Sequence, residues 1–263
     1  MRKYLYIYKA TLMESLQYIL NILLGFVSFF IILFIFFNLW DYIYSDSQNI
    51  IGGYTIKQMI WYVIITEIMW FGTRNTTLTA QISNDIKSGA IAYGINKPYN
   101  YMFYIAARHF GEITVKFFLF TGVGILIGLL FTGRLPGFQV LYLPFMAAAV
   151  FLGVLINSLI RIGISILSFW IEDSGPFHWI FDKLLIVVGT LFPVEVFPLW
   201  IQPLIKVTPI FVITYGPAKL IIDFSMGMFL NVLLVQLAYL AVTVLILTIL
   251  FRRGVAKLNV NGG

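Results

Sequence analysis

Residues 228–251 read MFLNVLLVQLAYLAVTVLILTILF, and this stretch contains no acidic or basic side chain. A helix rises 1.5 Å per residue, so roughly 20 apolar residues are enough to cross the hydrocarbon core of a bilayer. Arg252 and Arg253 follow immediately, and basic residues concentrate on the cytoplasmic side of membrane helices. The stretch therefore predicts a membrane-spanning helix whose carboxyl end lies in the cytoplasm.

Five further apolar segments precede this one, and one of them is interrupted. The uninterrupted segments are 19–40, 56–73, 113–132 and 140–160. Residues 184–205 carry Pro193, Pro198 and Pro203, and each proline removes a helix donor and clashes with the preceding turn. We expect a helix there that enters the membrane and then breaks into an external re-entrant segment. The prediction is an all-α integral membrane protein with six transmembrane helices, of which the fifth is discontinuous.

The composition agrees with a membrane protein and excludes a soluble globular domain. Of the 263 residues, 60% are hydrophobic and only 11% are charged, whereas soluble domains are about 45–50% apolar and about 25% charged. The chain has no cysteine, so disulfides and thiolate metal sites are excluded. The net charge of +6 comes from basic residues at the ends of apolar segments, which favours a role in topology over nucleic-acid binding.

The distribution of basic residues predicts the orientation of the chain. Loops on the cytoplasmic side of a membrane are enriched in Lys and Arg. Lys57, Arg134, Lys206 and Lys219 lie at one set of segment ends, Lys116 lies inside a span, and all the other basic residues lie at the opposite ends. We therefore expect a multi-pass protein of the plasma membrane with both termini in the cytoplasm.

The whole chain, 1–263, is expected to form one transmembrane domain. In residues 1–18, Leu5, Tyr8, Leu12 and Leu16 recur at spacings of three and four, which places them on one face of a helix. We interpret this segment as an amphipathic helix lying on the cytoplasmic interface. It either anchors the first span or acts as a lever that also contacts a cytoplasmic partner.

Residues 74–101 form the largest predicted cytoplasmic loop. Asp85 and Lys87 lie among the apolar residues Ile82, Ile86 and Ile91. Glycines interrupt the loop, and a proline near its end limits any helix ahead of it. A short helix with exposed apolar side chains on the water side of a membrane is typical of a docking surface.

No catalytic constellation is present in the sequence. The chain has no Gly-x-x-x-x-Gly-Lys-Ser/Thr loop to bind phosphates, and the Gly-Gly-Tyr-Thr-Ile-Lys stretch at Gly52 has the wrong spacing. It also lacks His-Glu-x-x-His and Gly-x-Ser-x-Gly motifs. We therefore expect no enzyme activity and no bound cofactor in this chain alone.

Ionisable residues within the apolar segments are candidates for function, because a charge at mid-membrane costs about 2.5–3.5 kcal/mol. Glu67 lies near the middle of the second segment. It is either a neutral or hydrogen-bonded group at a helix contact, or a group that lines a substrate path. Glu112 and Lys116 are four residues apart and are expected to pair along one helix face. Glu195 lies in the broken segment and would face an external vestibule.

Together these features resemble the type-2 ABC exporter permease family over nearly the whole chain. The resemblance rests on the amphipathic N-terminal helix and on the order and spacing of three motifs. The motifs are Ile86…Gly89-x-Ile91-Ala92…Lys97-Pro98, then Ser168-Phe169-Trp170…Asp173-Ser174, then Phe192-Pro193…Phe197-Pro198-x-Trp200 continuing to Pro209 and Tyr215-Gly216-Pro217-Ala218. Gly94-Ile95 stands where the family pattern predicts Leu-Leu, which weakens the docking expected there.

The resemblance implies a division of labour between subunits. Two permeases, identical or paralogous, would form a pathway in the lipid bilayer, and a cytoplasmic ATP-binding subunit would bind ATP and Mg and drive export. Residues 192–227 would form short external re-entrant helices. The residues implied to couple to the ATPase are Asp85, Ile86, Lys87, Gly89, Ile91, Lys97, Pro98, Glu172 and Asp173, and those implied for the translocation path are Glu67 and Glu195.

Two other classes of function remain open at this point. An ion-gradient-driven transporter could relay protons through Glu67, Glu112 and Glu195. A membrane scaffold or sensor could bind a partner through the same loops without moving a substrate. The aromatic-rich spans favour an amphiphilic or apolar cargo, such as a drug, a peptide or a lipid-like molecule.

Overall fold

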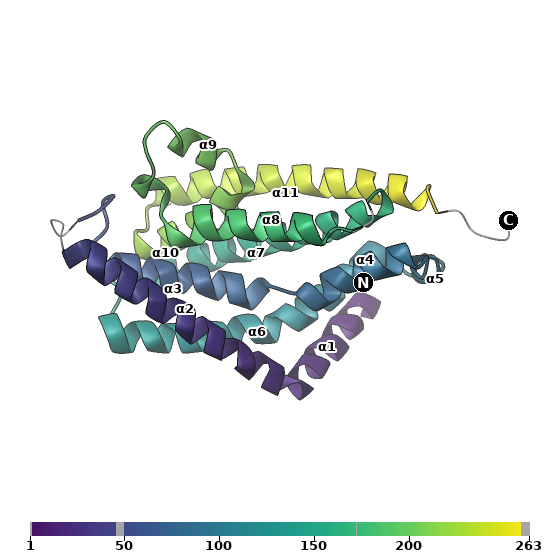
Figure 1. Cartoon of the computed structure of the whole chain (residues 1–263), viewed down its shortest axis with the longest axis horizontal. Helices are drawn as coiled ribbons and strands as arrows, with labels where there is room; N and C mark the ends of the chain where they lie inside the picture. Colours follow the sequence, from purple (N-terminus) through teal and green to yellow (C-terminus); the bar gives the residue numbers. More distant parts are fainter. Residues whose placement is uncertain (1, 46–49, 172, 259–263) are drawn as a thin grey trace.

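The computed structural model describes residues 2–45, 50–171 and 173–258, and most of these residues are helical. Figure 1 shows the long helices running along the longest axis, with α4, α5 and the carboxyl end of α11 at the same end of the molecule. The α-helices are α1 (Arg2–Gln17), α2 (Ile19–Ser45), α3 (Ile56–Thr73), α4 (Thr76–Lys87), α5 (Ile91–Ile95), α6 (Tyr101–Thr132), α7 (Leu143–Ile166), α8 (Gly175–Leu184), α9 (Gln202–Lys206), α10 (Gly216–Ile222) and α11 (Met226–Val255).

Four helical segments of the described chain are long and apolar enough to cross a membrane. They are Ile22–Ser45, Tyr101–Thr132, Val140–Phe169 and Met226–Val255. They correspond to the predicted first, third, fourth and sixth spans, which confirms the all-helical membrane class. Helix α3 coincides with the predicted second segment but is not among these four, since Lys57, Gln58 and Glu67 lie within its 18 residues. Its crossing of the membrane therefore stays a prediction.

Several helices extend beyond the segments predicted from hydropathy. Helix α6 begins at Tyr101 rather than at residue 113, because the side chain of Asn100 caps it by accepting a hydrogen bond from the Phe103 N–H at 3.2 Å. Helix α8 begins at Gly175, directly after the Asp173-Ser174 part of the second motif, rather than at residue 184. Proline at position 176 suits the first turn of a helix. Hydropathy began these segments after the charged residues Glu112 and Lys183, whereas both helices continue through them.

The fifth apolar segment is broken after α8, as its prolines predict. Helix α8 continues as a π-helix, η3 (Leu185–Leu191), and ends before Phe192, whose backbone is extended ahead of a proline. The Tyr62 hydroxyl of α3 donates to the Gly189 carbonyl at 2.7 Å. The Thr66 hydroxyl lies 3.4 Å from the Thr190 carbonyl oxygen and 3.0 Å from two carbonyl oxygens of its own helix. Hydroxyls of α3 therefore satisfy carbonyls at the buried end of this helix.

The remainder of the predicted external region consists of short helical pieces. After the break come η4 (Val194–Val196), α9, a second π-helix, η5 (Phe211–Tyr215), and α10. Figure 1 shows α9 at the edge of the bundle and α10 beside α3 and α7. The short pieces agree with the expected interruption, and their re-entry into a membrane stays a prediction.

Helix α1 packs along α6 through small and polar residues. A side chain on Gly111 would lie 2.8 Å from the Tyr8 carbonyl oxygen and from Thr11 Cβ, so the two helices approach closely there. Leu5 and Leu16, two residues of the predicted apolar face, are exposed. The helix is confirmed, but its protein-facing side is the Tyr8–Thr11 side, which leaves these leucines free to face lipid.

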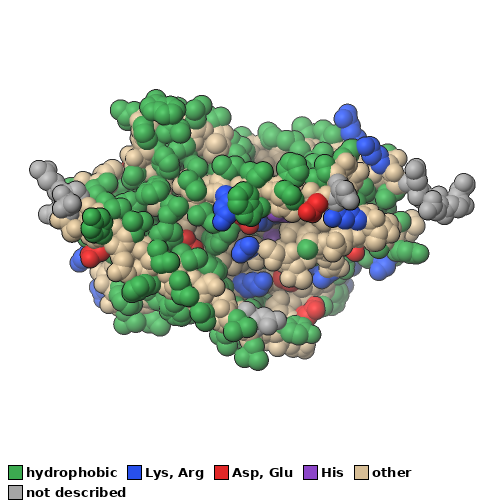
Figure 2. All heavy atoms as spheres, viewed as in Figure 1, with side chains coloured by type: hydrophobic (Ala, Val, Ile, Leu, Met, Phe, Trp, Pro, Cys, Tyr) green, Lys and Arg blue, Asp and Glu red, His purple; other side chains and the backbone are tan. Residues whose placement is uncertain are grey.

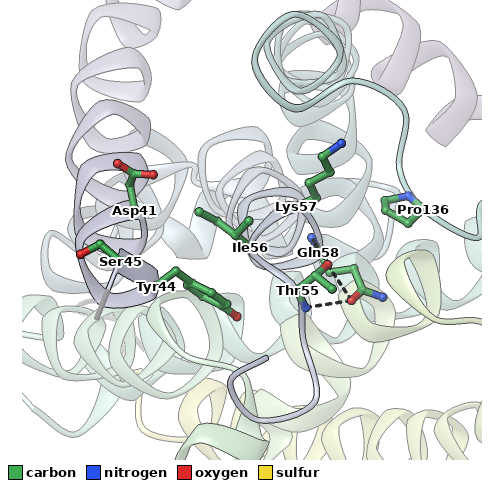
Figure 3. Close-up of a pocket in the computed structure, with 8 residues that line it drawn as sticks. All are labelled: Asp41, Tyr44, Ser45, Thr55, Ile56, Lys57, Gln58 and Pro136. Carbon is green, nitrogen blue, oxygen red and sulfur yellow. Dashed lines mark hydrogen bonds between the residues drawn. The ribbon is translucent and has the colours of Figure 1, made fainter. Parts of the chain in front are cut away.

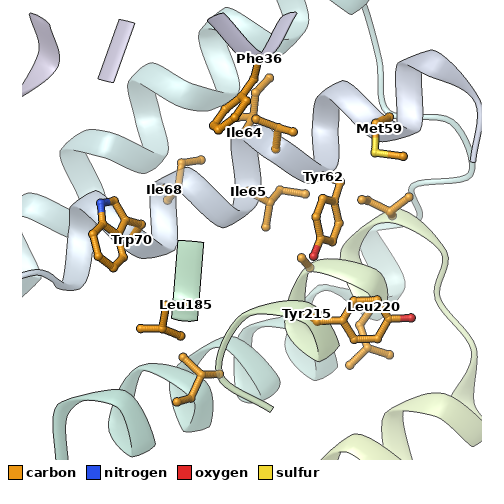
Figure 4. Packing of buried hydrophobic residues seen from close by; sticks show 14 of the residues in the cluster. Phe36, Met59, Tyr62, Ile64, Ile65, Ile68, Trp70, Leu185, Tyr215 and Leu220 are labelled. Carbon is orange, nitrogen blue, oxygen red and sulfur yellow. The ribbon is translucent and has the colours of Figure 1, made fainter. Parts of the chain in front are cut away.

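The core surrounds α3. Its residues from Trp61 to Trp70 are all buried, and Figure 4 shows Tyr62 extending from α3 toward the segment that carries Tyr215. Helix α6 comes close to α3 at two glycines, because a side chain on Gly124 or Gly128 would collide with residues of α3. Helix α3 also packs against α2, α7, α10 and the two π-helices.

Candidate functional site

The α4–α5 segment (residues 76–98) is fixed to the bundle by isoleucines. Ile82, Ile86 and Ile91 are 1%, 6% and 1% exposed and pack in a second apolar core with Ile162 and Ile166 of α7. The expectation that these isoleucines form an exposed docking surface is therefore wrong. Helices α6, α7 and α11 extend to the same end of the molecule and cover them.

The tip of the α4–α5 segment is exposed. Lys87, Gly89, Lys97 and Pro98 reach the surface, and Tyr93 is 79% exposed. Gly89 has a φ of +74°, with open space where a side chain would begin. The turn therefore requires glycine for its backbone conformation rather than for room.

Two contacts join the α4–α5 segment to Asp173 and Ser174, which precede α8. Lys87 Nζ lies 3.6 Å from Asp173 Oδ1, and the hydroxyls of Ser83 and Ser174 lie 2.6 Å apart. Asp173 also accepts a hydrogen bond from the Gly175 N–H at 3.0 Å, and this bond, together with the nearby Lys87, lowers the pKa of Asp173. The predicted Asp173 position is thus joined to Lys87, whereas Glu172 lies outside the described residues.

Asp85 is half-buried rather than fully solvated. Burial raises the pKa of Asp85, and the Arg108 guanidinium opposes that shift. Arg108 itself donates to Gln81 Oε1 at 3.1 Å on the same face of α4. Asp85 therefore lies close to Arg108 of α6, on the α4 side of the exposed tip around Gly89.

Glu67 lies inside the bundle and borders a cavity of about 130 Å³. Its side chain is 2% exposed, and its Oε2 has no hydrogen-bond partner among the described residues. Ile32 and Phe36 of α2, Trp70 of α3 and Ile186 of η3 form much of the wall. The sequence placed Glu67 in a span, and the structure shows that apolar side chains surround it.

Glu195 is held by three neighbours at the opposite end of the molecule. It accepts hydrogen bonds from the Tyr54 hydroxyl at 3.1 Å and the Tyr215 hydroxyl at 2.5 Å. Lys219 Nζ lies 3.8 Å from its Oε1 and 4.2 Å from the centre of the Tyr54 ring. The carboxylate thus joins the α2–α3 connection to η5 and α10.

The two predicted pathway acids are not brought together. Glu195 contacts Tyr54, just before α3, whereas Glu67 lies about 16 Å further along the α3 axis at 1.5 Å per residue. Glu112 accepts a hydrogen bond from Asn75 at 2.6 Å and lies 3.5 Å from Arg108. The expected Glu112–Lys116 ion pair is absent from the described residues. The closer partners are Asn75, which caps α4, and Arg108, which lies one turn earlier on α6.

A buried ion pair was missed by sequence reasoning. Arg161 marked the cytoplasmic end of a span, but its side chain is 3% exposed and its Nη1 lies 2.7 Å from Asp182 Oδ1 of α8. Arg161 also donates to Asn157 at 3.2 Å and lies against the rings of Trp70 and Phe181. Asp182 on a half-apolar helix was the available signal, because a buried acid requires a cation.

Histidine side chains strengthen the same region. The His178 Nε2 lies 2.9 Å from the Ser165 hydroxyl, which joins α8 to α7 a second time. His109 Nε2 lies 2.9 Å from the Ser158 hydroxyl and joins α6 to α7. Within the described ranges, no group of three His, Asp or Glu side chains could hold a metal ion.

A separate pocket of about 570 Å³ lies at the amino end of α3, shown in Figure 3. Asp41, Lys57 and Gln58 are among the residues that line it. Gln58 is engaged in a capping box, with its Oε1 accepting a hydrogen bond from the Thr55 N–H at 3.0 Å. The side chains of Thr55 and Gln58 therefore pair with backbone N–H groups at the start of α3.

Figure 2 shows hydrophobic side chains over much of one face of the molecule, with charged side chains gathered at its middle and toward the end that holds α4 and α5. A face covered largely by hydrophobic side chains is expected of a protein embedded in a bilayer, where no hydrated exterior is required.

The family model described as "ABC-2 family transporter protein" matches residues 27–262. No curated protein matches the chain. The matched range includes the four spanning segments almost entirely, the α4–α5 segment and the cavity beside Glu67, and it excludes α1.

Proposed function

Since the chain belongs to the ABC-2 transporter family of membrane proteins, we propose that it is the membrane-spanning permease subunit of an ATP-driven exporter. A separate cytoplasmic subunit would bind ATP and Mg²⁺ and hydrolyse the nucleotide. A second permease, identical or paralogous, would complete the pathway. In this proposal the chain forms the translocation path and moves in response to the ATP-binding subunit. The absence of a phosphate-binding loop from its sequence is consistent with that role.

The proposed topology has six spans in the plasma membrane and both termini in the cytoplasm. Helix α3 and the α8–η3 helix serve as the second and fifth spans, and α1 lies on the cytoplasmic interface. The amino end of α1, the α4–α5 segment and the carboxyl end of α11 lie toward one end of the molecule (Figure 1), which supports a shared cytoplasmic side. The short pieces after residue 192 would re-enter the membrane from outside.

The α4–α5 segment carries the proposal. Its tip is exposed around Gly89, while Ile82 and Ile86 are buried against the bundle and Lys87 pairs with Asp173. A subunit that pushes on the tip would therefore move α6, α7 and α8 with it, since packed side chains transmit displacement. This combination is what a coupling element requires.

The cargo path is proposed along the cavity beside Glu67, between α2, α3 and η3. Its walls are apolar apart from the carboxyl group, which supports an amphiphilic or apolar cargo. Glu195 is occupied by Tyr54, Tyr215 and Lys219, so its proposed role is to close the external end of the path rather than to contact cargo along it.

A pull-down of the solubilised chain, with mass spectrometry of its partners, tests the proposal. A stoichiometric subunit with a phosphate-binding loop is expected, and recovery of the chain alone across several mild detergents would refute it. A proton-driven transporter receives less support, because Glu67, Glu112 and Glu195 form no contact chain in the described structure. Cargo uptake into reconstituted inside-out vesicles that requires ATP separates the two functions.

Gly89→Trp tests the coupling element, with Gly133→Trp as a matched control. Both glycines have φ of +74° and open space around them, so both substitutions impose the same backbone strain. Gly133 follows α6 at the end away from α4, so its variant is expected to export normally. Gly89→Trp is expected to insert normally and to separate ATP hydrolysis from export. Normal export by Gly89→Trp would contradict the coupling role.

A further inference from the structure

The carboxyl group of Glu67 differs from the other acids inside the bundle. Asp182 pairs with Arg161, and Glu112 lies beside Arg108 and accepts a hydrogen bond from Asn75. Glu67 has no ion pair or hydrogen bond among the described residues, although its side chain is 2% exposed. An unpaired buried carboxyl is costly in an apolar surrounding, and membrane proteins retain such groups chiefly for function.

The carboxyl group borders a cavity that has room for a ligand. The cavity holds about 130 Å³, whereas one water molecule needs only about 10–15 Å³ by the same kind of measure. Ile35 of α2 lies on its wall and is 54% exposed, so the cavity reaches the outer surface of α2. A molecule that lies along α2 in the bilayer could therefore insert one end beside Glu67.

The wall determines what kind of group could enter. Besides Glu67, the lining consists of Ile32, Ile35, Phe36, Trp70 and Ile186, and none of these can donate a hydrogen bond to the carboxylate except the indole of Trp70. Figure 4 shows Phe36 above α3 and Trp70 further along the same helix. An acceptor surrounded by aliphatic and aromatic side chains favours a cation with apolar substituents.

The basic residues near the cavity are already engaged. Arg74 and Arg161 lie 5.5 Å and 5.6 Å from the Trp70 ring centre, outside the residues that line the cavity. Both pair with Asp182, at 3.8 Å and 2.7 Å. Their charge is therefore directed toward Asp182, and neither forms an ion pair with Glu67.

We propose that this cavity binds the positively charged head of an amphiphilic cargo, an alkyl- or arylammonium group, with Glu67 as its counter-ion and the apolar tail lying along α2. This inference rests on the proposed transport function and narrows its cargo from amphiphiles in general to amphiphilic cations. Neutral and anionic amphiphiles of equal length gain no such partner, so the site selects by charge.

Photolabelling of the full chain in nanodiscs of zwitterionic lipid tests the site. The probe is an octylammonium with a diazirine in its tail, and the matched probes are the octanol and the octyl sulfate. Labelling of peptides that carry residues 32–36 and 186 is expected to fall at least tenfold in Glu67→Gln. Glu14→Gln, a matched acid-to-amide change on the exposed face of α1, is expected to label like the wild type. Equal labelling of wild type and Glu67→Gln overturns the inference.

Ile186→Trp provides a second variant, because it fills the cavity and retains the carboxyl group. Loss of ammonium labelling is expected, while octyl sulfate labelling stays at its wild-type level. Unchanged ammonium labelling in a folded Ile186→Trp chain would also overturn the site.

Co-purification of an ATP-binding subunit is measured on the same preparations, which separates the two claims. Co-purification together with charge-independent labelling refutes the cation site and leaves the permease function standing. Failure of the wild type to co-purify refutes the permease function, and Glu67-dependent labelling would then still support a cation site.

Discussion

Replacing Arg161 by Met is expected to destabilise the protein strongly, because it leaves Asp182 buried without its nearest cation. The two groups lie 2.7 Å apart, and the side chains of Arg161 and Asp182 are 3% and 12% exposed. Removing one member of a buried pair costs about 3–5 kcal/mol. Arg74 remains 3.8 Å from the carboxylate and compensates in part, so we expect about 3 kcal/mol. For a chain of this size, that corresponds to a fall in Tm of about 6–12 °C.

The double variant Arg161→Met, Asp182→Leu separates pairing from packing. Removing both charges of a buried pair is often neutral or stabilising, because no ion is left unpaired. The double variant is therefore expected to melt near the wild type and well above Arg161→Met. Arg134→Met, at an exposed position, controls for the loss of one positive charge and is expected to melt within about 1 °C of the wild type.

Thermal unfolding followed by size-exclusion chromatography of a fluorescent fusion in one detergent measures all four proteins. Two results would refute the reasoning. One is an Arg161→Met protein that melts with the Arg134→Met control. The other is a double variant that melts as low as Arg161→Met, because the loss would then come from packing around Trp70 and Phe181 rather than from the unpaired acid.

Three further predictions follow from other contacts. Gly111→Leu should displace α1 from α6 at a cost of about 1–3 kcal/mol, because its Cβ would lie 2.8 Å from the backbone of α1. Faster cleavage of α1 by trypsin would report this displacement. The control Gly122→Leu, whose side chain would enter open space, should be cleaved at the wild-type rate. Glu195→Leu should destabilise the protein by about 1–3 kcal/mol, because the hydroxyls of Tyr54 and Tyr215 lose their acceptor. Glu195→Gln keeps an acceptor oxygen and should lose less stability. Equal Tm values of the two variants in detergent would count against these hydrogen bonds. Burial raises the pKa of Asp85, so the folded state binds the Asp85 proton more tightly than the unfolded state. Stability therefore falls as pH rises from the ordinary Asp pKa through this raised pKa. Asp85→Asn should remove that part of the pH dependence of Tm, and an unchanged pH profile would show that Asp85 does not cause it.

The sequence predicted the apolar helices because length and hydropathy suffice for that inference. Residues 228–251 could be recognised directly, since a stretch without charge has few alternatives. The same reasoning failed at Arg161, because a basic residue at the end of a span looks identical whether it reaches water or pairs inside the bundle. Its partner, Asp182, lies on another helix, and only the packing of α7 against α8 brings the two together.

The candidate site was predictable in position but not in exposure. The interrupted loop indicated a short helix near Gly89, and the structure has α4 and α5 on either side of it. Ile82 and Ile86 were expected to face water because hydropathy placed the membrane boundary at Arg74. Helices α6 and α7 continue past that boundary, and they bury these side chains. The length of one helix thus decides the exposure of another, which a single segment of sequence cannot reveal.

The hydroxyl groups of α3 that contact backbone carbonyls near the end of η3 affect which substitutions the protein can accumulate over time. Tyr62 and Thr66 bind backbone carbonyls of Gly189 and Thr190, and every residue type supplies a carbonyl. Most positions in Leu185–Leu191 can therefore drift among apolar residues without losing these bonds, whereas Tyr62 and Thr66 cannot drift. Across relatives of this chain, we expect variation to concentrate on the fifth helix and constancy on the face of α3 that meets it, with Gly189 as the exception because its neighbour Thr214 leaves no space for a side chain.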